Sequence, residues 1–194
     1  LLLIYALNFF ISLITLPHLI KSYGTFKWGN IVFFQIIINY LIWIIDWSFN
    51  QYSAKFISIN YKNLKEQIRI YRETKTAQLI LLLFSLAVSF ILLLSLGNGK
   101  ELFISFSLIL IGSYLQSYWY LNGLEKIYEA ALIQLFNKCL FAALIIFLIN
   151  ENSTIGLYFL FYGIGNITTG ILCQLIIQKK YKQFIIFENF KSGI

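Results

Sequence analysis

The sequence is short of the residues that most enzymes and metal sites use. Its 194 residues include no methionine, one proline, one histidine and two cysteines, and only 12% are charged. One histidine and two cysteines are too few for a zinc site or a disulfide framework, so we expect no metal and no cofactor. No Ser-His-Asp set, paired carboxylates or phosphate-binding loop indicates an enzyme. Soluble domains carry about 25% charged residues, so the composition also argues against a soluble protein.

Apolar residues dominate what is present. They make up 59% of the chain, and the mean hydropathy is +0.77, which is typical of an integral membrane protein. The formal net charge is +7. In an apolar chain this surplus points to anionic membrane lipids as partners and not to nucleic acid. Because the sequence has no initial methionine and opens inside the apolar run Leu1–Ile4, we expect it to be part of a longer protein.

Six stretches are long and apolar enough to cross a membrane, which takes about 20 residues. They are residues 1–20, 31–51, 76–96, 102–121, 130–149 and 155–177. Short polar connections separate most of them, so neighbouring helices should run antiparallel. We therefore predict an all-α integral membrane fold, a six-transmembrane-helix bundle over residues 1–177, followed by a cytoplasmic linker at 178–194.

The distribution of basic residues predicts the orientation of this bundle. Lys and Arg accumulate on the cytoplasmic side of membrane proteins. One side would carry eleven of them: Lys55, Lys62, Lys65, Arg69, Arg72, Lys75, Lys126, Lys179, Lys180, Lys182 and Lys191. The other side would carry three: Lys21, Lys27 and Lys100. Both ends of this chain are therefore expected in the cytoplasm.

The connection from Ser53 to Lys75 has its own periodicity. Its apolar residues recur at alternating spacings of four and three: Ile57, Tyr61, Leu64, Ile68 and Tyr71. This stripe predicts one amphipathic helix lying in the cytoplasmic headgroup layer. A solvated connector is the alternative.

Each predicted span carries a stripe of polar or small residues. The stripes are Asn8, Ser12, Thr15; Gln35, Asn39, Asp46; Gln78, Ser85, Ser89; Ser105, Gly112, Gln116, Trp119, Gly123; Gln134, Asn137, Lys138; and Tyr162, Asn166, Thr169, Cys173. Such residues can hold helices together, or they can face a hydrated cavity. Four large amides, an acid and a lysine favour the cavity, and a cavity in a six-helix bundle indicates transport.

Three motifs resemble a known family. Pro17–Gly24 reads PHLIKSYG and precedes Trp28 and Gly29. Asp46–Ser58 reads DWSFNQYSAKFIS, and Leu115–Lys126 reads LQSYWYLNGLEK. Together they resemble the Wzx-type polysaccharide and O-antigen flippases of the multidrug/oligosaccharidyl-lipid/polysaccharide exporter superfamily. The chain departs from the family pattern at Lys21 and Lys55, where Arg is usual, at Ser48, where Gly is usual, and at Ser117, where Pro is usual.

This resemblance implies the amino-terminal lobe of a two-lobe exporter in the bacterial inner membrane. Such a protein would move an undecaprenyl-pyrophosphate-linked oligosaccharide from the cytoplasmic to the periplasmic leaflet, alongside other membrane proteins of polysaccharide assembly. Lys21, Lys55 and Lys138 would then supply charge for the pyrophosphate. Sugar hydroxyls would meet the amides of Gln35, Asn39, Gln116 and Asn166, and Trp119 would stack on a sugar face. Glu125 would brace the gate that opens inward.

Two further functions remain as alternatives. One is a multidrug or small-cation exporter of the same superfamily, which would favour an acidic cavity. The other is a membrane enzyme such as an oligosaccharide polymerase, which would need a large outer loop.

Within the bundle, Asp46 and Lys138 should lie at a similar depth, about 10–12 Å from the cytoplasmic face, and we expect them to pair. The alternative for Asp46 is a side chain that reaches the interface.

Overall fold

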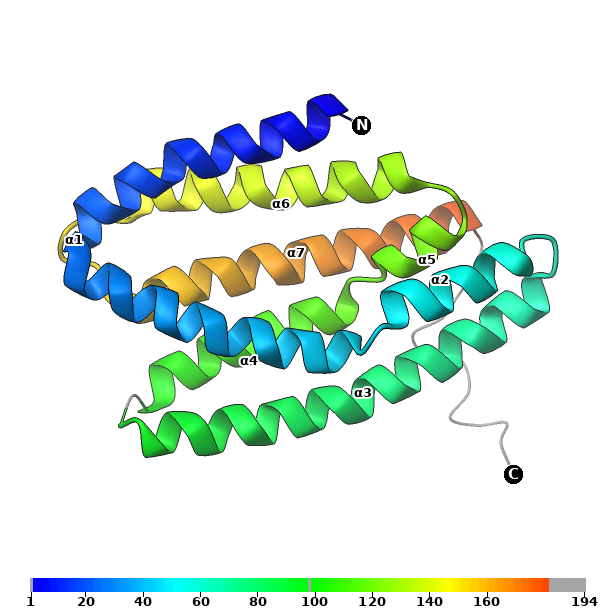
Figure 1. Cartoon of the computed structure of the whole chain (residues 1–194), viewed down its shortest axis with the longest axis horizontal. Helices are drawn as coiled ribbons and strands as arrows, with labels where there is room; N and C mark the ends of the chain where they lie inside the picture. The colour runs from blue at the N-terminus through cyan, green and yellow to red at the C-terminus, as the bar shows by residue number, and fades with distance from the viewer. Residues whose placement is uncertain (1, 98, 182–194) are drawn as a thin grey trace.

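The computed structural model describes residues 2–97 and 99–181, and these residues form a bundle of α-helices (Figure 1). The helices are α1 (Leu2–Asp46), α2 (Phe49–Ile59), α3 (Leu64–Ser95), α4 (Gly99–Leu115), α5 (Tyr118–Gly123), α6 (Ile127–Leu148) and α7 (Ile155–Tyr181). Five helical segments in this part of the chain are long and apolar enough to cross a membrane. This part of the chain is therefore all-helical, and the protein is a multi-pass membrane protein.

The first predicted span and most of the second, up to Asp46, fall within one bent helix, so the expected count of six is not confirmed. At 1.5 Å per residue, the 45 residues of α1 correspond to about 68 Å, more than twice the thickness of a bilayer core. The helix bends at Gly24, whose φ of 71° and ψ of 165° are accessible to glycine and costly for other residues. Figure 1 shows that both arms extend from this bend, at one end of the bundle, toward the other end, so the direction of the chain reverses between them.

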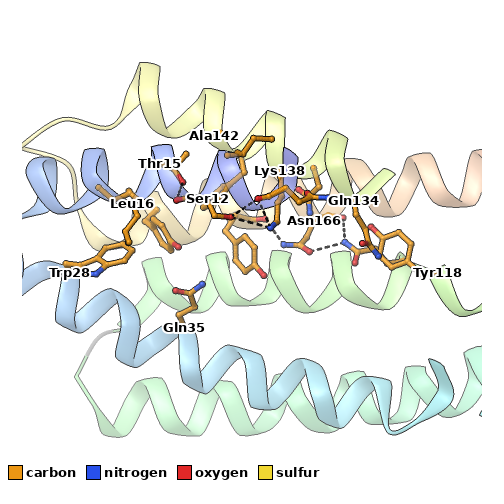
Figure 2. A pocket seen from close by; sticks show the side chains of 18 residues that line it. Ser12, Thr15, Leu16, Trp28, Gln35, Tyr118, Gln134, Lys138, Ala142 and Asn166 are labelled. Atoms are coloured by element: carbon orange, nitrogen blue, oxygen red, sulfur yellow. Dashed lines mark hydrogen bonds between the residues drawn. The ribbon is translucent and has the colours of Figure 1, made fainter. Parts of the chain in front are cut away.

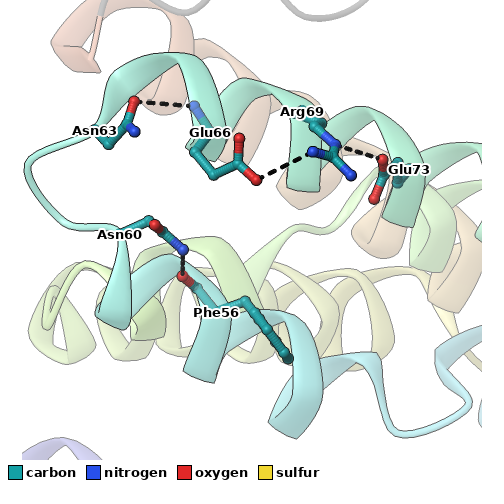
Figure 3. A network of polar contacts seen from close by, with 6 residues as sticks. All are labelled: Phe56, Asn60, Asn63, Glu66, Arg69 and Glu73. Carbon is teal, nitrogen blue, oxygen red and sulfur yellow. Dashed lines mark hydrogen bonds and ion pairs between the residues drawn. The ribbon is translucent and has the colours of Figure 1, made fainter.

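The connection between the second and third predicted spans is a helical hairpin, and the prediction of one interfacial helix is wrong. A turn at residues 60–63 separates α2 from α3. Ile57 and Tyr71 from the predicted stripe are buried in one shared cluster, whereas Tyr61 and Leu64 are exposed at the turn. The turn ends where the side chain of Asn63 accepts a hydrogen bond from the Glu66 amide at 3.3 Å (Figure 3).

The third membrane helix begins earlier than its apolar stretch. Residues 64–75 are rich in Lys, Arg, Glu and Gln. These residues are too polar to count as part of an apolar stretch, but they favour helix formation. On the exposed face of this extension, Arg69 forms ion pairs with Glu66 at 3.4 Å and with Glu73 at 2.9 Å (Figure 3). Because all three side chains are solvent-exposed, these pairs add little stability.

The fourth predicted span, 102–121, is broken in two. α4 ends at Leu115 and α5 begins at Tyr118, so Gln116 and Ser117 lie outside regular helix. The last two spans agree closely with α6 and α7, which are joined by a short turn. Residues 178–181 of the predicted linker continue α7, and residues 182–194 lie outside the described part of the chain.

The core has two clusters of buried side chains. The larger cluster joins the second arm and the bend region of α1 to α3, α4, α6 and α7 around the rings of Phe34, Phe106 and Phe159. The smaller one lies around Tyr71, Trp119 and Tyr120, where α2, α3, α5, α6 and α7 meet. The bend of α1 is held against the α6–α7 turn, where the Tyr23 hydroxyl donates to the Thr154 carbonyl at 3.2 Å.

Candidate functional site

A cavity of about 650 Å³ lies between the first arm of α1, helices α6 and α7, and the break between α4 and α5, and residues of the second arm of α1 complete its wall (Figure 2). Its polar lining consists of Asn8, Ser12, Thr15, Gln35, Gln116, Gln134, Asn137, Lys138 and Asn166. Its aromatic lining consists of Trp28, Tyr118, Phe141, Tyr158 and Tyr162. The polar stripes of α1 and α6 therefore meet across a hollow in the bundle.

One wall of the cavity is organised by the Gln116 side chain at the break between α4 and α5. Its Nε2 donates to Asn166 Oδ1 at 2.9 Å and to Thr169 Oγ1 at 3.1 Å, both on α7. Asn166 in turn donates from Nδ2 to the Tyr162 carbonyl at 2.8 Å. These amides fix the orientation of one another, which presents a pre-arranged polar surface to the cavity.

Glycines bring α4 and α7 close together beside this wall. A Cβ on Gly112 would lie 2.7 Å from the backbone carbon of Asn166, and one on Gly170 would lie 2.6 Å from Leu115 Cβ. Only glycine permits this approach without displacement of one helix. The close approach places Asn166 within reach of Gln116.

Lys138 supplies the cation in the cavity. Its Nζ donates to the Asn8 carbonyl at 3.2 Å and to Ser12 Oγ at 3.3 Å, so it links α6 to the first arm of α1. The expected pair between Lys138 and Asp46 is therefore wrong. Asp46 ends the second arm of α1, where its carboxylate accepts from Asn50 Nδ2 at 3.2 Å and is attracted electrostatically to Lys75 of α3.

The predicted substrate-contacting residues are divided between the cavity and the rest of the bundle. Gln35, Gln116, Lys138 and Asn166 line the cavity. Lys21, Asn39 and Lys55 are exposed and do not line it. Trp119 is buried in the smaller core cluster, 5.3 Å from the ring of Tyr71, so a stacking role for it in the cavity is excluded in this structure.

The predicted gating residue lies in the turn between α5 and α6. Glu125 is exposed and has a left-handed φ of 60°. Its amide donates to the Asn122 carbonyl at 3.0 Å, and among the described residues its carboxylate has no hydrogen bond or ion pair. Its role in gating stays a prediction.

Of the aromatic residues of the cavity, the sequence placed only Tyr162 in a stripe that could face it. Trp28, Tyr118 and Tyr158 line it, yet aromatic residues are so common in this chain, at 19%, that the sequence assigned none of these three to a cavity. Two buried amide oxygens, Asn8 Oδ1 and Asn137 Oδ1, have no hydrogen-bond partner among the described residues, although both residues line the cavity. Water or a polar ligand in the cavity would satisfy them.

Not every polar stripe faces the cavity. The stripe on α3 is buried in helix contacts instead, where Ser85 Oγ donates to the Leu41 carbonyl at 3.4 Å. The polar residues of α3 therefore serve helix packing. Those of the first arm of α1 and of the middle of α6 line the cavity instead.

Comparison with known proteins gives one informative match. No family model and no solved structure matches the sequence. The chain is 22% identical over 173 residues to a protein of Escherichia coli strain K12 that is named as a candidate O-antigen transporter. The match covers 88% of this chain but only 42% of that relative, so the chain spans less than half of the relative's length. The chain is therefore similar, at a distance, to an O-antigen transporter-like family.

Proposed function

We propose that this chain forms part of a flippase that moves a lipid-linked oligosaccharide across the bacterial inner membrane, from the cytoplasmic to the periplasmic leaflet. The observation that carries the proposal is the cavity, in which amides, aromatic rings and one lysine face open volume inside a bundle of apolar helices. The similarity to a protein named for O-antigen transport supports a transporter and not an enzyme. The three motifs that resemble Wzx-type flippases support the finer assignment.

The chemistry of the cavity suits a glycan. Sugar hydroxyls need partners that both donate and accept, and the side-chain amides of Gln35, Gln116 and Asn166 do both. The rings of Trp28 and Tyr118 offer flat apolar surfaces for sugar faces. Lys138 provides a positive charge for the pyrophosphate or for an acidic sugar, because its present acceptors are neutral oxygens that an anion can replace.

The same lining disfavours a drug or cation exporter. No Asp or Glu is among the described residues that line the cavity, and its one charged side chain is a lysine. A cavity of this sign would repel a small cation.

The proposal includes the membrane arrangement. We infer that both arms of α1 cross the bilayer, which would give six crossings with the bend at Gly24 on the periplasmic side. The α2–α3 turn, the α5–α6 connection and the end of α7 lie together at the opposite end of the bundle (Figure 1). A second lobe, supplied by the rest of a longer protein, would close the open side of the cavity in an alternating-access cycle.

The test compares two amides in the full-length protein, expressed in its native host. Asn166→Leu removes a cavity amide, and Asn39→Leu removes an exposed amide outside the cavity. We expect Asn166→Leu to reduce surface polysaccharide and to accumulate lipid-linked oligosaccharide in the cytoplasmic leaflet, whereas Asn39→Leu should export normally. Normal surface polysaccharide in the Asn166→Leu strain, at unchanged protein abundance, would overturn the proposal.

A further inference from the structure

The break between α4 and α5 creates a specific problem for a membrane helix. A helix that stops inside the bilayer leaves its last carbonyl groups without backbone donors, and hydrocarbon offers no water to replace them. Here the helical hydrogen-bond pattern is lost at Ser117, whose amide donates to Cys173 Sγ of α7 at 3.4 Å. The carbonyls of Tyr114 and Leu115 therefore need hydrogen-bond donors from outside their own helix.

Side chains from two other helices supply those donors. Lys75 of α3 donates from Nζ to the Tyr114 carbonyl, and its ammonium lies 4.6 Å from the centre of the Tyr114 ring. Gln174 of α7 donates from Nε2 to the Leu115 carbonyl at 2.6 Å. The broken helix therefore has a cap built from α3 and α7.

The Gln174 side chain is itself held in place. The Tyr71 hydroxyl donates to Gln174 Oε1 at 2.9 Å, and Gln174 Nε2 also donates to Ser117 Oγ at 3.0 Å. Gln174 is only 5% exposed, and Tyr71 and Ser117 are buried as well. A buried network with satisfied partners has one favoured arrangement, so it specifies the geometry of the break.

The cap and the cavity meet at the same two-residue interruption. Lys75 and Gln174 act on the carbonyls that precede it, while Gln116 and Tyr118 line the cavity. We propose that Lys75 and Gln174 are positioning residues: they fix the broken fourth span so that Gln116 and Tyr118 face the cavity. Their importance for transport rests on the proposed function, but their effect on the geometry does not.

The experiment measures that geometry directly in the full-length protein. Cysteines replace Gln116 and Asn166 in a background with Cys139→Ser and Cys173→Ser, and a short bifunctional thiol reagent joins them in native membranes. Lys75→Met should lower the cross-linked fraction several-fold, because the Tyr114 carbonyl loses its donor. Lys75→Arg, which keeps the charge and the donor, should restore it. The matched control is Lys65→Met, the same substitution at an exposed position of α3.

The cross-linked fraction is expressed per molecule, so that reduced abundance does not imitate the effect. If Lys75→Met protein does not accumulate, Gln174→Leu removes the other half of the cap and should give the same several-fold loss. An unchanged fraction in the variant that accumulates, or an equal loss in Lys65→Met, would overturn the proposal. Surface polysaccharide is measured in separate strains, in which Lys75→Met, Lys75→Arg or Lys65→Met is the only substitution and Gln116 and Asn166 are intact. A failure of the proposed function would appear as normal export despite lost cross-linking, whereas a failure of this inference would appear in the cross-linking itself.

Discussion

Gln116 joins two helices through a single amide, and its loss should therefore weaken the bundle as well as the cavity. Substitution of Gln116 by Leu leaves Asn166 Oδ1 without its donor inside the bundle, which costs about 1–3 kcal/mol. We expect a lower midpoint of thermal unfolding in detergent. Gln134→Leu is the matched control, because Gln134 lies on the α6 wall and has no hydrogen bond among the described residues. Equal midpoints for the two variants would contradict the structural role of Gln116.

Two substitutions at Glu125 distinguish the effect of backbone strain on stability from the effect of the carboxylate on export. Its φ of 60° costs a residue with a Cβ about 1–2 kcal/mol, so Glu125→Gly should raise the thermal midpoint. Glu125→Gln keeps the strain and removes only the charge, and it should reduce export at unchanged abundance if the carboxylate braces the gate. Wild-type levels of surface polysaccharide in the Glu125→Gln strain would rule out that role, whatever the stability of the glycine variant.

At the scale of elements, the contact between α4 and α7 depends on the absence of side chains. A Cβ on Gly112 would meet the backbone of α7 at 2.7 Å, and a backbone cannot swing away as a flexible side chain can. Gly112→Ala should therefore destabilise the protein by about 1–3 kcal/mol, as overpacked sites do. Gly29→Ala is the control, because open space surrounds Gly29 on α1. Thermal unfolding in detergent measures both, and a Gly112→Ala midpoint at or above that of Gly29→Ala would refute the close contact.

The elements that the sequence predicts well are those in which apolar length and turn residues agree. α7 begins at Ile155, as expected, after the polar turn that follows α6. The start of α3 was missed because charged helix formers precede the apolar stretch. The break after Leu115 was missed because neither Pro nor Gly marks it, and the donors that stabilise it, Lys75 and Gln174, are distant in sequence.

The same break explains why only part of the candidate site was foreseen. A continuous helix would keep Gln116 and Trp119 on one face, three residues apart. The interruption changes the direction of the chain between them, so Gln116 stays on the cavity wall, Tyr118 joins it, and Trp119 enters the core. Lys138 and Asp46 were paired by depth alone. The depth of a residue does not determine which helix its side chain faces. Lys138 faces the first arm of α1, whereas Asp46 lies near Lys75 of α3.

At the scale of the whole molecule, the ends of the bundle differ in charge. The basic α2–α3 hairpin lies at one end, and the bend of α1 and the α6–α7 turn lie at the other (Figure 1). The excess of Lys and Arg predicts that the hairpin end is cytoplasmic. Two exposed asparagines in turns mark the two ends: Asn63 between α2 and α3, and Asn152 between α6 and α7.

Single cysteines at these two positions test the orientation. In a background with Cys139→Ser and Cys173→Ser, Asn63→Cys should resist a membrane-impermeant thiol reagent applied to cells with a permeable outer membrane and an intact inner membrane. Asn152→Cys should react, because it lies at the other end of the bundle, and both should react once the inner membrane is opened. Labelling of Asn63→Cys from outside, with Asn152→Cys protected, would reverse the orientation. The cavity would then have to be assigned the opposite direction of access, while its lining and its polarity would stay as described.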